Sequence, residues 1–122
     1  MVEGLRVLVV EDNAAIRSSL SILLEREGFD VIAVAEFRKA IELIKRELFD
    51  TLITDLDLPG GTGLDLLVLA RAMRPRMRSI LMTGYGRSAV RKQALEMGLS
   101  GYFEKPFDPE ELLRALRLSP PL

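Results

Sequence analysis

The stretch LITDLDLPG, Leu52–Gly60, is a short apolar run that stops on a carboxylate just where turn residues begin. The residues before Asp55 favour a β-strand, whereas Pro59 and Gly60 favour a turn. The side chain of Asp55 is therefore expected at the carboxyl end of a strand. In an open α/β sheet, ligands bind at that edge, beside the point where the strand order reverses. The function thus depends on which other residues reach the same place.

Length and composition indicate one soluble domain. The chain has 122 residues, of which 48% are hydrophobic and 29% are charged. A chain of this length buries roughly two-thirds of its unfolded surface as a single domain. No apolar run approaches the roughly 20 residues that a bilayer requires, and no leader-like segment opens the chain. We therefore expect a cytoplasmic protein that does not contact a membrane, with a domain over residues 1–118 and a tail or the start of a linker at 119–122.

The residue types that are missing restrict the chemistry. The chain has no cysteine and no histidine, so it has no ordinary zinc site, no disulfide framework and no histidine general base. The remaining reactive groups are carboxylates, hydroxyls, lysines and the hard cations that oxygen atoms bind. The net charge is -1, from 17 basic and 18 acidic residues. Because this balance gives no strongly positive field, we expect no direct binding of nucleic acid.

Strand-like and helix-like patterns alternate five times along the chain. Strands are expected at residues 5–10, 30–34, 49–54, 79–82 and 101–103. Helices are expected between Asn13 and Gly28, along 37–44, at 64–73, at 88–97 and from Pro109 onward, and 59–63 is expected to be a loop. With right-handed crossovers, this alternation gives a parallel sheet with helices on both faces. The predicted fold is α/β, a single doubly wound (βα)5 domain with the flavodoxin-like strand order 2-1-3-4-5.

Residues that can handle metals or phosphates follow four of the predicted strands. Glu11 and Asp12 follow the first strand, and Asp55 follows the third. Thr83 ends the fourth strand, and Lys105 follows the fifth. Because parallel strands present their carboxyl ends at one edge of a sheet, we expect these five side chains to meet there.

Three carboxylates in one pocket repel one another unless a cation lies among them. Mg²⁺ fits, because it prefers oxygen ligands and is commonly held by one or two carboxylates together with a phosphate oxygen. We assign Asp12 and Asp55 as direct ligands, Glu11 as a ligand through water, and the backbone carbonyl of Asp57 as a further ligand. The sequence therefore predicts Mg²⁺ as the cofactor.

The same group of residues suits phosphoryl transfer. With a cation beside the incoming phosphoryl group, a carboxylate oxygen of Asp55 can attack phosphorus in line. Lys105 adds a second positive charge, and the hydroxyl of Thr83 can donate to a phosphoryl oxygen. Each residue also has an ordinary structural interpretation, as a turn former, a helix cap or a surface charge. Separate structural roles would rarely place these residue types after four strands in this order. We therefore favour one site that contains all of them.

Four motifs, taken together, resemble the receiver domain of two-component response regulators. They are VVEDN at 9–13, ITDLDLPG at 53–60 with Gly63, MTG at 82–84, and YFEKPF at 102–107. The resemblance extends over residues 5–117, nearly the whole chain.

The resemblance implies a role for each residue of the site. Asp55 would accept a phosphoryl group from a phosphohistidine of a sensor histidine kinase or phosphotransfer protein. Glu11 and Asp12 would form the acid pocket, in which Glu11 replaces the commoner Asp. Thr83 and Lys105 would bind the phosphoryl group. The chain would then be no conventional enzyme, although it would catalyse its own Mg²⁺-dependent phosphorylation and autodephosphorylation.

The resemblance also implies a switch. On phosphorylation the Thr83 hydroxyl would move toward the phosphoryl group, and the Tyr102 ring would turn into the space that it leaves. This would reshape the surface of the fourth helix, fifth strand and fifth helix, which would contact an output domain or another downstream partner. A homodimer that depends on phosphorylation is left open.

Five further residues receive smaller roles. We expect Asp57, Gly84 and Tyr85 to tune hydrolysis of the acyl phosphate by shaping the access of water. Gly63 and Pro106 are expected to be structural, and the resemblance implies a cis peptide bond between Lys105 and Pro106.

Two alternative functions stay open at this point. Asp55 and Asp57 match the Asp-x-Asp nucleophile motif of haloacid-dehalogenase-like phosphatases. However, Pro59 stands where that motif usually has Thr or Val, and the motif follows the third strand instead of the first. The second alternative is a receiver-like interaction module that is never phosphorylated.

Overall fold

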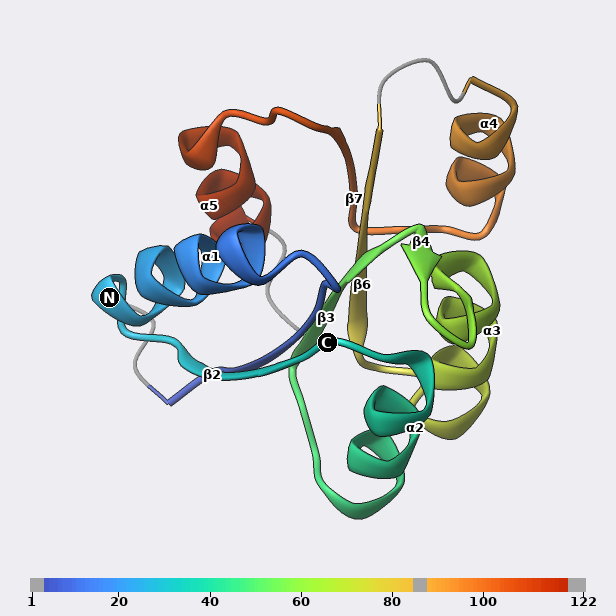
Figure 1. Ribbon diagram of the computed structural model, residues 1–122, viewed down its shortest axis with the longest axis horizontal. Helices are drawn as coiled ribbons and strands as arrows, with labels where there is room; N and C mark the ends of the chain where they lie inside the picture. Colours follow the sequence, from blue (N-terminus) through green and yellow to red (C-terminus); the bar gives the residue numbers. More distant parts are fainter. Residues whose placement is uncertain (1–3, 85–87, 119–122) are drawn as a thin grey trace.

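A computed structural model describes residues 4–84 and 88–118 (Figure 1). The strands are β1 (Arg6–Val10), β2 (Asp30–Val34), β3 (Thr51–Asp55), β4 (Asp57–Leu58), β5 (Gly61–Thr62), β6 (Arg78–Thr83) and β7 (Gly101–Glu104). The helices are α1 (Ala14–Arg26), α2 (Phe37–Arg46), α3 (Gly63–Met73), α4 (Ser88–Glu96) and α5 (Pro109–Leu118). The expected tail at 119–122 lies outside the described residues. Within the described ranges, no helix is long and apolar enough to cross a membrane.

Five parallel strands form the central sheet in the order β2-β1-β3-β6-β7. Counted along the sheet-forming strands alone, this order is 2-1-3-4-5, so the predicted flavodoxin-like topology is confirmed. β1 and β3 are neighbours, with Val10 paired with Thr54. On the far side of β3, Asp55 is paired with Met82 of β6. The strand order therefore reverses beside β1 and β3, where their carboxyl ends meet.

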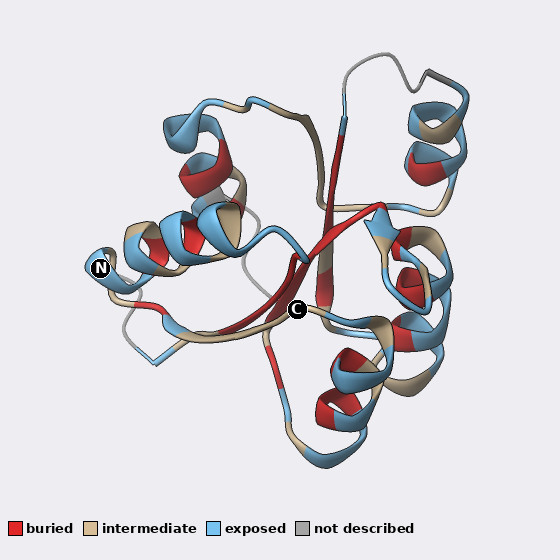
Figure 2. Ribbon diagram, viewed as in Figure 1, coloured by how far each residue is buried: buried red, intermediate tan, exposed pale blue. Residues whose placement is uncertain are grey.

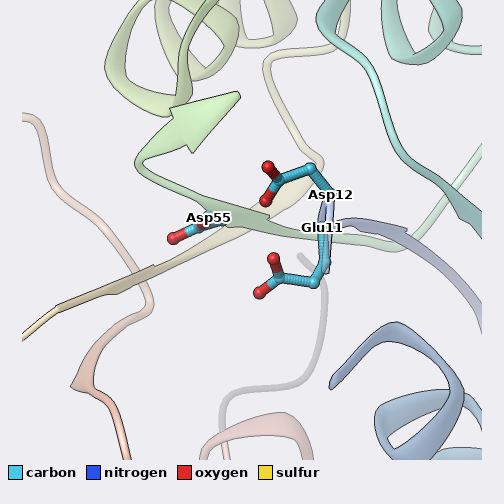
Figure 3. Close-up of side chains that lie close together, drawn as sticks. All are labelled: Glu11, Asp12 and Asp55. Carbon is cyan, nitrogen blue, oxygen red and sulfur yellow. The ribbon is translucent and has the colours of Figure 1, made fainter. Parts of the chain in front are cut away.

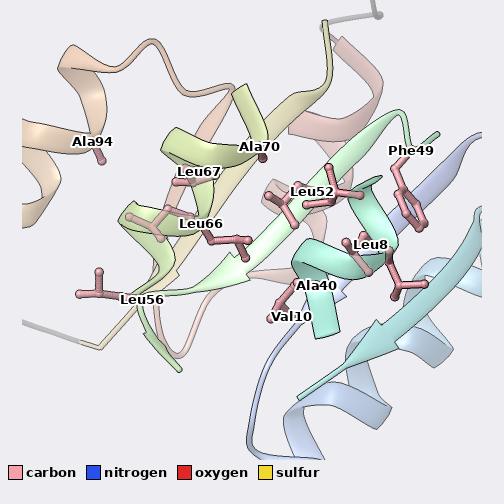
Figure 4. Close-up of a cluster of buried hydrophobic side chains, with 13 residues drawn as sticks. Leu8, Val10, Ala40, Phe49, Leu52, Leu56, Leu66, Leu67, Ala70 and Ala94 are labelled. Atoms are coloured by element: carbon pink, nitrogen blue, oxygen red, sulfur yellow. The ribbon is translucent and has the colours of Figure 1, made fainter. Parts of the chain in front are cut away.

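The sheet separates two hydrophobic clusters. In β1, Leu8 and Val10 face the cluster covered by α2, α3 and α4, whereas Val7 and Val9 face the one covered by α1 and α5. This division follows from the alternation of side chains along a strand. Figure 2 shows the inner strands buried along most of their length, and Figure 4 shows the cluster on the α2 and α3 side. Because both faces are covered, β1 reads as one continuous apolar run.

The helix boundaries follow local signals in the sequence. The Asn13 side chain accepts a hydrogen bond from the backbone N–H of Ile16 at 3.0 Å, and Gly28 follows α1 with a φ of 94°. The Asp108 side chain accepts from the N–H of Glu110 at 2.9 Å at the start of α5. Asn13 and Asp108 are therefore the N-caps of α1 and α5.

The segment predicted as a loop at 59–63 differs from that expectation. Asp57 pairs with Thr62 in a two-stranded antiparallel ribbon, β4 and β5, and α3 begins at Gly63. The ribbon packs on α2, because a Cβ on Gly61 would lie 2.6 Å from the ring of Phe37. The backbone N–H of Phe37 also donates to the carbonyl of Pro59 at 3.2 Å. A contact with a distant helix stabilises this ribbon, so local turn signals alone did not predict it.

A buried arginine ties the sheet to the end of α5. Arg78, the first residue of β6, donates to the carbonyls of Leu116, at 2.8 Å, and Ala115. Burial lowers the pKa of Arg78. The C-terminal carbonyls of a helix carry partial negative charge, so they are suitable partners for a buried guanidinium.

Candidate functional site

Three carboxylates meet at the carboxyl edge of the sheet (Figure 3). One oxygen atom from each of Glu11, Asp12 and Asp55 lies within 4.8 Å of the other two. Glu11 and Asp12 follow β1 and Asp55 ends β3, so the pairing of the two strands brings them together. Glu11 and Asp55 are buried, whereas Asp12 is exposed. Two members of this carboxylate cluster are therefore buried, and the third is open to solvent.

Glu11 is fixed by hydrogen bonds on all of its polar groups. Its backbone N–H donates to the carbonyl of Val34 at 3.0 Å, and its Oε2 accepts from the N–H of Asn13 at 3.1 Å. Its Oε1 lies 2.5 Å from Nζ of Lys105. This charged side chain is completely buried, so it needs such partners.

Lys105 brings a positive charge to the carboxylates from the loop after β7. Its backbone N–H donates to the carbonyl of Thr83 at 2.8 Å, and its Nζ lies 3.3 Å from Oδ1 of Asp55. The peptide bond between Lys105 and Pro106 is cis, as the resemblance implied. Lys105 therefore pairs with two of the three carboxylates, Glu11 and Asp55.

The charges of the site shift two pKa values. Burial and the nearby charge of Glu11 raise the pKa of Asp55, and Lys105 opposes the shift only in part. Burial alone would lower the pKa of Lys105, but its hydrogen bonds and charge pairing with Glu11 and Asp55 outweigh burial and raise it. Lys105 therefore stays charged, while the negative charge of the pocket is incompletely balanced.

Thr83 has a buried hydroxyl with no hydrogen-bond partner among the described residues. Thr83 ends β6, one position after Met82, which pairs with Asp55. Its Oγ1 is fully buried. A buried hydroxyl without a partner costs free energy, so its presence points to a partner that arrives with a ligand. The carboxylates and Lys105 form a set that fits a hard cation and a phosphoryl group, and Thr83 ends the strand next to that of Asp55.

The backbone around Asp55 needs a glycine at position 63. A Cβ on Gly63 would overlap the carbonyl oxygen of Asp55, and the N–H of Gly63 donates to the carbonyl of Leu56 at 2.6 Å. The N–H of Leu56 in turn donates to Oδ1 of Asp55 at 2.9 Å. Gly63 thus lets α3 begin directly against the proposed acceptor.

The structure describes four of the remaining predicted residues, which are Gly84, Tyr102, Asp57 and Pro106. Tyr85 lies outside the described residues. Gly84 follows Thr83, and a Cβ there would meet no atom within 4 Å. Tyr102 is half-buried in β7 and packs against the cluster on the α4 side, and Asp57 is exposed in β4. Pro106 follows Lys105 in the loop that leads to α5.

One arginine at the site was missed by the sequence reasoning. The guanidinium of Arg17, in α1, donates through Nη1 to the carbonyl of Glu11 at 2.8 Å and to that of Asp12 at 3.3 Å. Side chains on a helix point toward its N-terminus, and this direction carries Arg17 back to the end of β1. A basic residue one turn after the N-cap was the signal that could have found it.

Comparisons with known proteins identify the family. A family model described as the response regulator receiver domain matches residues 7–117. The chain belongs to this family. The predicted fold class and resemblance are therefore confirmed, and the phosphatase and the never-phosphorylated module are not favoured.

Curated relatives of this receiver domain differ in length. It is 37% identical over 108 residues to the response regulator protein FleR of Pseudomonas aeruginosa, covering 88% of this chain and 23% of that protein. It is 29% identical over 117 residues to sporulation initiation phosphotransferase F of Bacillus subtilis, covering 96% of this chain and 94% of that protein. The chain thus spans less than a quarter of the first relative and nearly all of the second.

Solved structures of receiver domains share the fold. A CheY-like response regulator receiver domain protein from Methanospirillum hungatei has a TM-score of 0.88 at 33% identity, covering 93% of this chain and 91% of that one. The receiver domain of a sensor histidine kinase from Pseudomonas aeruginosa has a TM-score of 0.84 at 29% identity, covering 94% and 96%. That second structure has a magnesium ion coordinated in its active-site cleft.

Proposed function

We propose that Asp55 of this receiver domain accepts a phosphoryl group from a phosphohistidine of a sensor histidine kinase or phosphotransfer protein. The observation that carries the proposal is the meeting of the carboxylates of Glu11, Asp12 and Asp55, with the ammonium group of Lys105 paired to Glu11 and Asp55. Within this group Asp55 is paired with Lys105, and its strand is the neighbour of the strand that ends at Thr83, whose hydroxyl has no partner among the described residues. No other described cluster offers the same combination of acids, cation and free hydroxyl.

In the transfer step, a carboxylate oxygen of Asp55 forms a bond to phosphorus while the bond from phosphorus to the histidine nitrogen breaks. The nitrogen keeps the electron pair of that bond, and the product is an acyl phosphate on Asp55. Lys105 is already 3.3 Å from Oδ1 of Asp55, so it can turn from the carboxylate to a phosphoryl oxygen without a large movement. The Thr83 hydroxyl gains its missing acceptor at the same time.

Mg²⁺ is the cofactor that the site would hold. Asp12 and Asp55 would be direct ligands, with the backbone carbonyl of Asp57 as a further ligand and Glu11 acting through water. When bound, the ion supplies positive charge that offsets both the carboxylates and the phosphoryl oxygens. The raised pKa of Asp55 supports the need for such a charge, because Lys105 alone does not balance the pocket.

Thr83 and Tyr102 would pass the effect of phosphorylation to the surface of the domain. A bond from the Thr83 hydroxyl to a phosphoryl oxygen would draw that side chain toward Asp55 and give the half-buried ring of Tyr102 room to move inward. The surface of α4, β7 and α5 would then change and contact an output domain or a separate partner, or support a homodimer. Asp57, Gly84 and Tyr85 would tune the lifetime of the acyl phosphate.

We propose that this signalling takes place in the cytoplasm, without direct nucleic-acid contact by this domain.

Intact mass spectrometry after incubation with acetyl phosphate and Mg²⁺ tests the proposal. The wild type should gain one phosphoryl group, whereas Asp55→Asn should gain none. Chelation of Mg²⁺ by EDTA should prevent labelling of the wild type. Labelling that persists in Asp55→Asn, or steady turnover of a small phosphate monoester, would contradict the proposal.

A further inference from the structure

Among the described residues, Arg17 is the one basic side chain that bonds to the backbone carbonyls of Glu11 and Asp12. Its Nη1 donates to the carbonyl oxygens of both Glu11 and Asp12. Arg17 is itself fixed in α1, since its N–H donates to the carbonyl of Asn13 at 2.9 Å and its carbonyl accepts from Oγ of Ser21 at 2.9 Å. The guanidinium therefore links the end of β1 to the first turns of α1.

A hydrogen bond to a carbonyl group restrains the backbone torsion of its residue, and the backbone in turn sets the direction of the Cα–Cβ bond from which the side chain extends. Glu11 has further anchors, through Val34, Asn13 and Lys105. Asp12 is exposed, and its carbonyl is held by Arg17. Loss of the Arg17 contact would consequently release Asp12 more than Glu11, and Asp12 is the residue assigned as a direct ligand of Mg²⁺.

We infer that Arg17 is a positioning residue that presets Asp12 for Mg²⁺ through the backbone carbonyls at the end of β1. This inference rests on the proposed function, because it assumes that the acid pocket binds the ion. In this role Arg17 would bond to backbone carbonyls and would touch neither the ion nor the phosphoryl group. Its role is that of an outer partner that orients a ligand, and the loss of such partners typically weakens metal binding by about 10–100-fold.

The hydrogen bonds of Arg17 should increase the affinity for Mg²⁺, whereas its positive charge should decrease it. A positive group near the pocket repels Mg²⁺, so its removal would by itself strengthen binding. Arg17 is only half-buried, and water and salt weaken the effect of such a charge. Orientation should therefore outweigh repulsion, and the direction of the change in affinity decides between the two effects.

Isothermal titration of the metal-free protein with Mg²⁺, without a phosphodonor, tests this inference. Arg17→Met should bind Mg²⁺ about tenfold more weakly than the wild type, the lower end of the range for an outer partner. Arg17→Lys should stay within about twofold, because an ammonium group still donates to carbonyl oxygens. Arg26→Met is the matched control, since Arg26 is exposed at the other end of the same helix. Unchanged or tighter binding by Arg17→Met would overturn the inference.

A second measurement distinguishes a positioning role of Arg17 from a general loss of activity. The initial rate of Asp55 labelling by acetyl phosphate is measured against Mg²⁺ concentration. Arg17→Met should need about tenfold more Mg²⁺ for half-maximal rate and reach nearly the wild-type maximum. A lower maximum at an unchanged Mg²⁺ requirement would overturn the inference. If Arg17→Met does not fold, as judged by circular dichroism in EDTA, Arg17→Leu, which also has no donor, takes its place with the same expected results.

The inference and the proposed function can fail separately. If Asp55 is never labelled but Arg17→Met still weakens Mg²⁺ binding, the proposed function is wrong and the role of Arg17 stands. If the wild type binds no Mg²⁺, the role of Arg17 is wrong.

Discussion

Thr54 and Thr83 are buried threonines near the ends of the neighbouring strands β3 and β6, but their hydroxyls differ. Oγ1 of Thr54 donates to the carbonyl of Asp55 at 2.9 Å. Oγ1 of Thr83 has no partner among the described residues. At the scale of single residues, one threonine thus contributes a hydrogen bond to the fold, while the other carries a cost that the proposed phosphoryl ligand would offset.

Replacing each threonine by valine should change stability in opposite directions. Thr83→Val removes an unsatisfied buried hydroxyl and should stabilise the protein without phosphate by about 1 kcal/mol, whereas Thr54→Val should destabilise it by about 1 kcal/mol. Urea unfolding in EDTA measures both. Thr83→Val should also slow labelling of Asp55 by acetyl phosphate. Destabilisation by both substitutions would show that Thr83 already has a partner in the folded protein.

At the scale of elements, the start of α3 is built against the end of β3. Gly63 is the position where the two approach most closely, because any side chain there would meet the backbone of Asp55. Thr62 is the N-cap of α3, accepting from the N–H of Asp65 at 3.1 Å. The position of the helix and that of the acceptor are therefore set together.

Gly63→Ala should force these two backbones apart. We expect a loss of about 2 kcal/mol in the free energy of unfolding, within the range for overpacking a close contact, together with slower labelling of Asp55. Gly84→Ala is the matched control for stability, because a Cβ there meets open space and φ is not positive. Denaturant unfolding and mass spectrometry check the two effects. Equal stability of the two variants would mean that α3 can shift away freely.

The elements show why some features could be predicted and others could not. The strands around Asp55 and the cap at Asn13 follow from neighbouring residues, so the fold and the meeting of the carboxylates were predicted. The ribbon of β4 and β5 depends on packing between Gly61 and the distant Phe37, which no local pattern indicates. Arg17 reaches the site because a helical side chain points backward, and this is visible only when the helix is placed against β1.

At the scale of the whole molecule, the ionisation of Asp55 opposes folding. Burial, then the charge of Glu11, raises the pKa of Asp55 in the folded protein above its value in the unfolded chain, and Lys105 reverses only part of the shift. The folded protein thus holds the proton more tightly. Protonation of Asp55 therefore contributes to the free energy of unfolding. This contribution is fully present below the ordinary aspartate pKa and is lost as the pH rises through the raised pKa of the folded protein.

Asp55→Asn should therefore become more stable than the wild type as the pH rises. In EDTA we expect little difference near pH 4 and an advantage of about 1 kcal/mol at pH 7, the size of a typical substitution effect. Mg²⁺ should reduce the advantage, since it should bind the wild type more tightly than a variant that lacks one of its carboxylate ligands. Urea unfolding across this pH range measures it, with the exposed Glu42→Gln as control. A constant difference at every pH would contradict the assignment to Asp55.

The hydrogen bonds from Arg78 to the carbonyls of Ala115 and Leu116 hold the end of α5 near the start of β6. Asp55 lies at the other end of the strands, where their carboxyl ends meet. β6 runs from Arg78 to Thr83, a span of about 17 Å at the usual rise per residue of a strand. Any polypeptide that continues past α5 therefore starts about a full strand length away from Asp55. A segment attached there would have to extend across that distance before it could contact a phosphorylated Asp55.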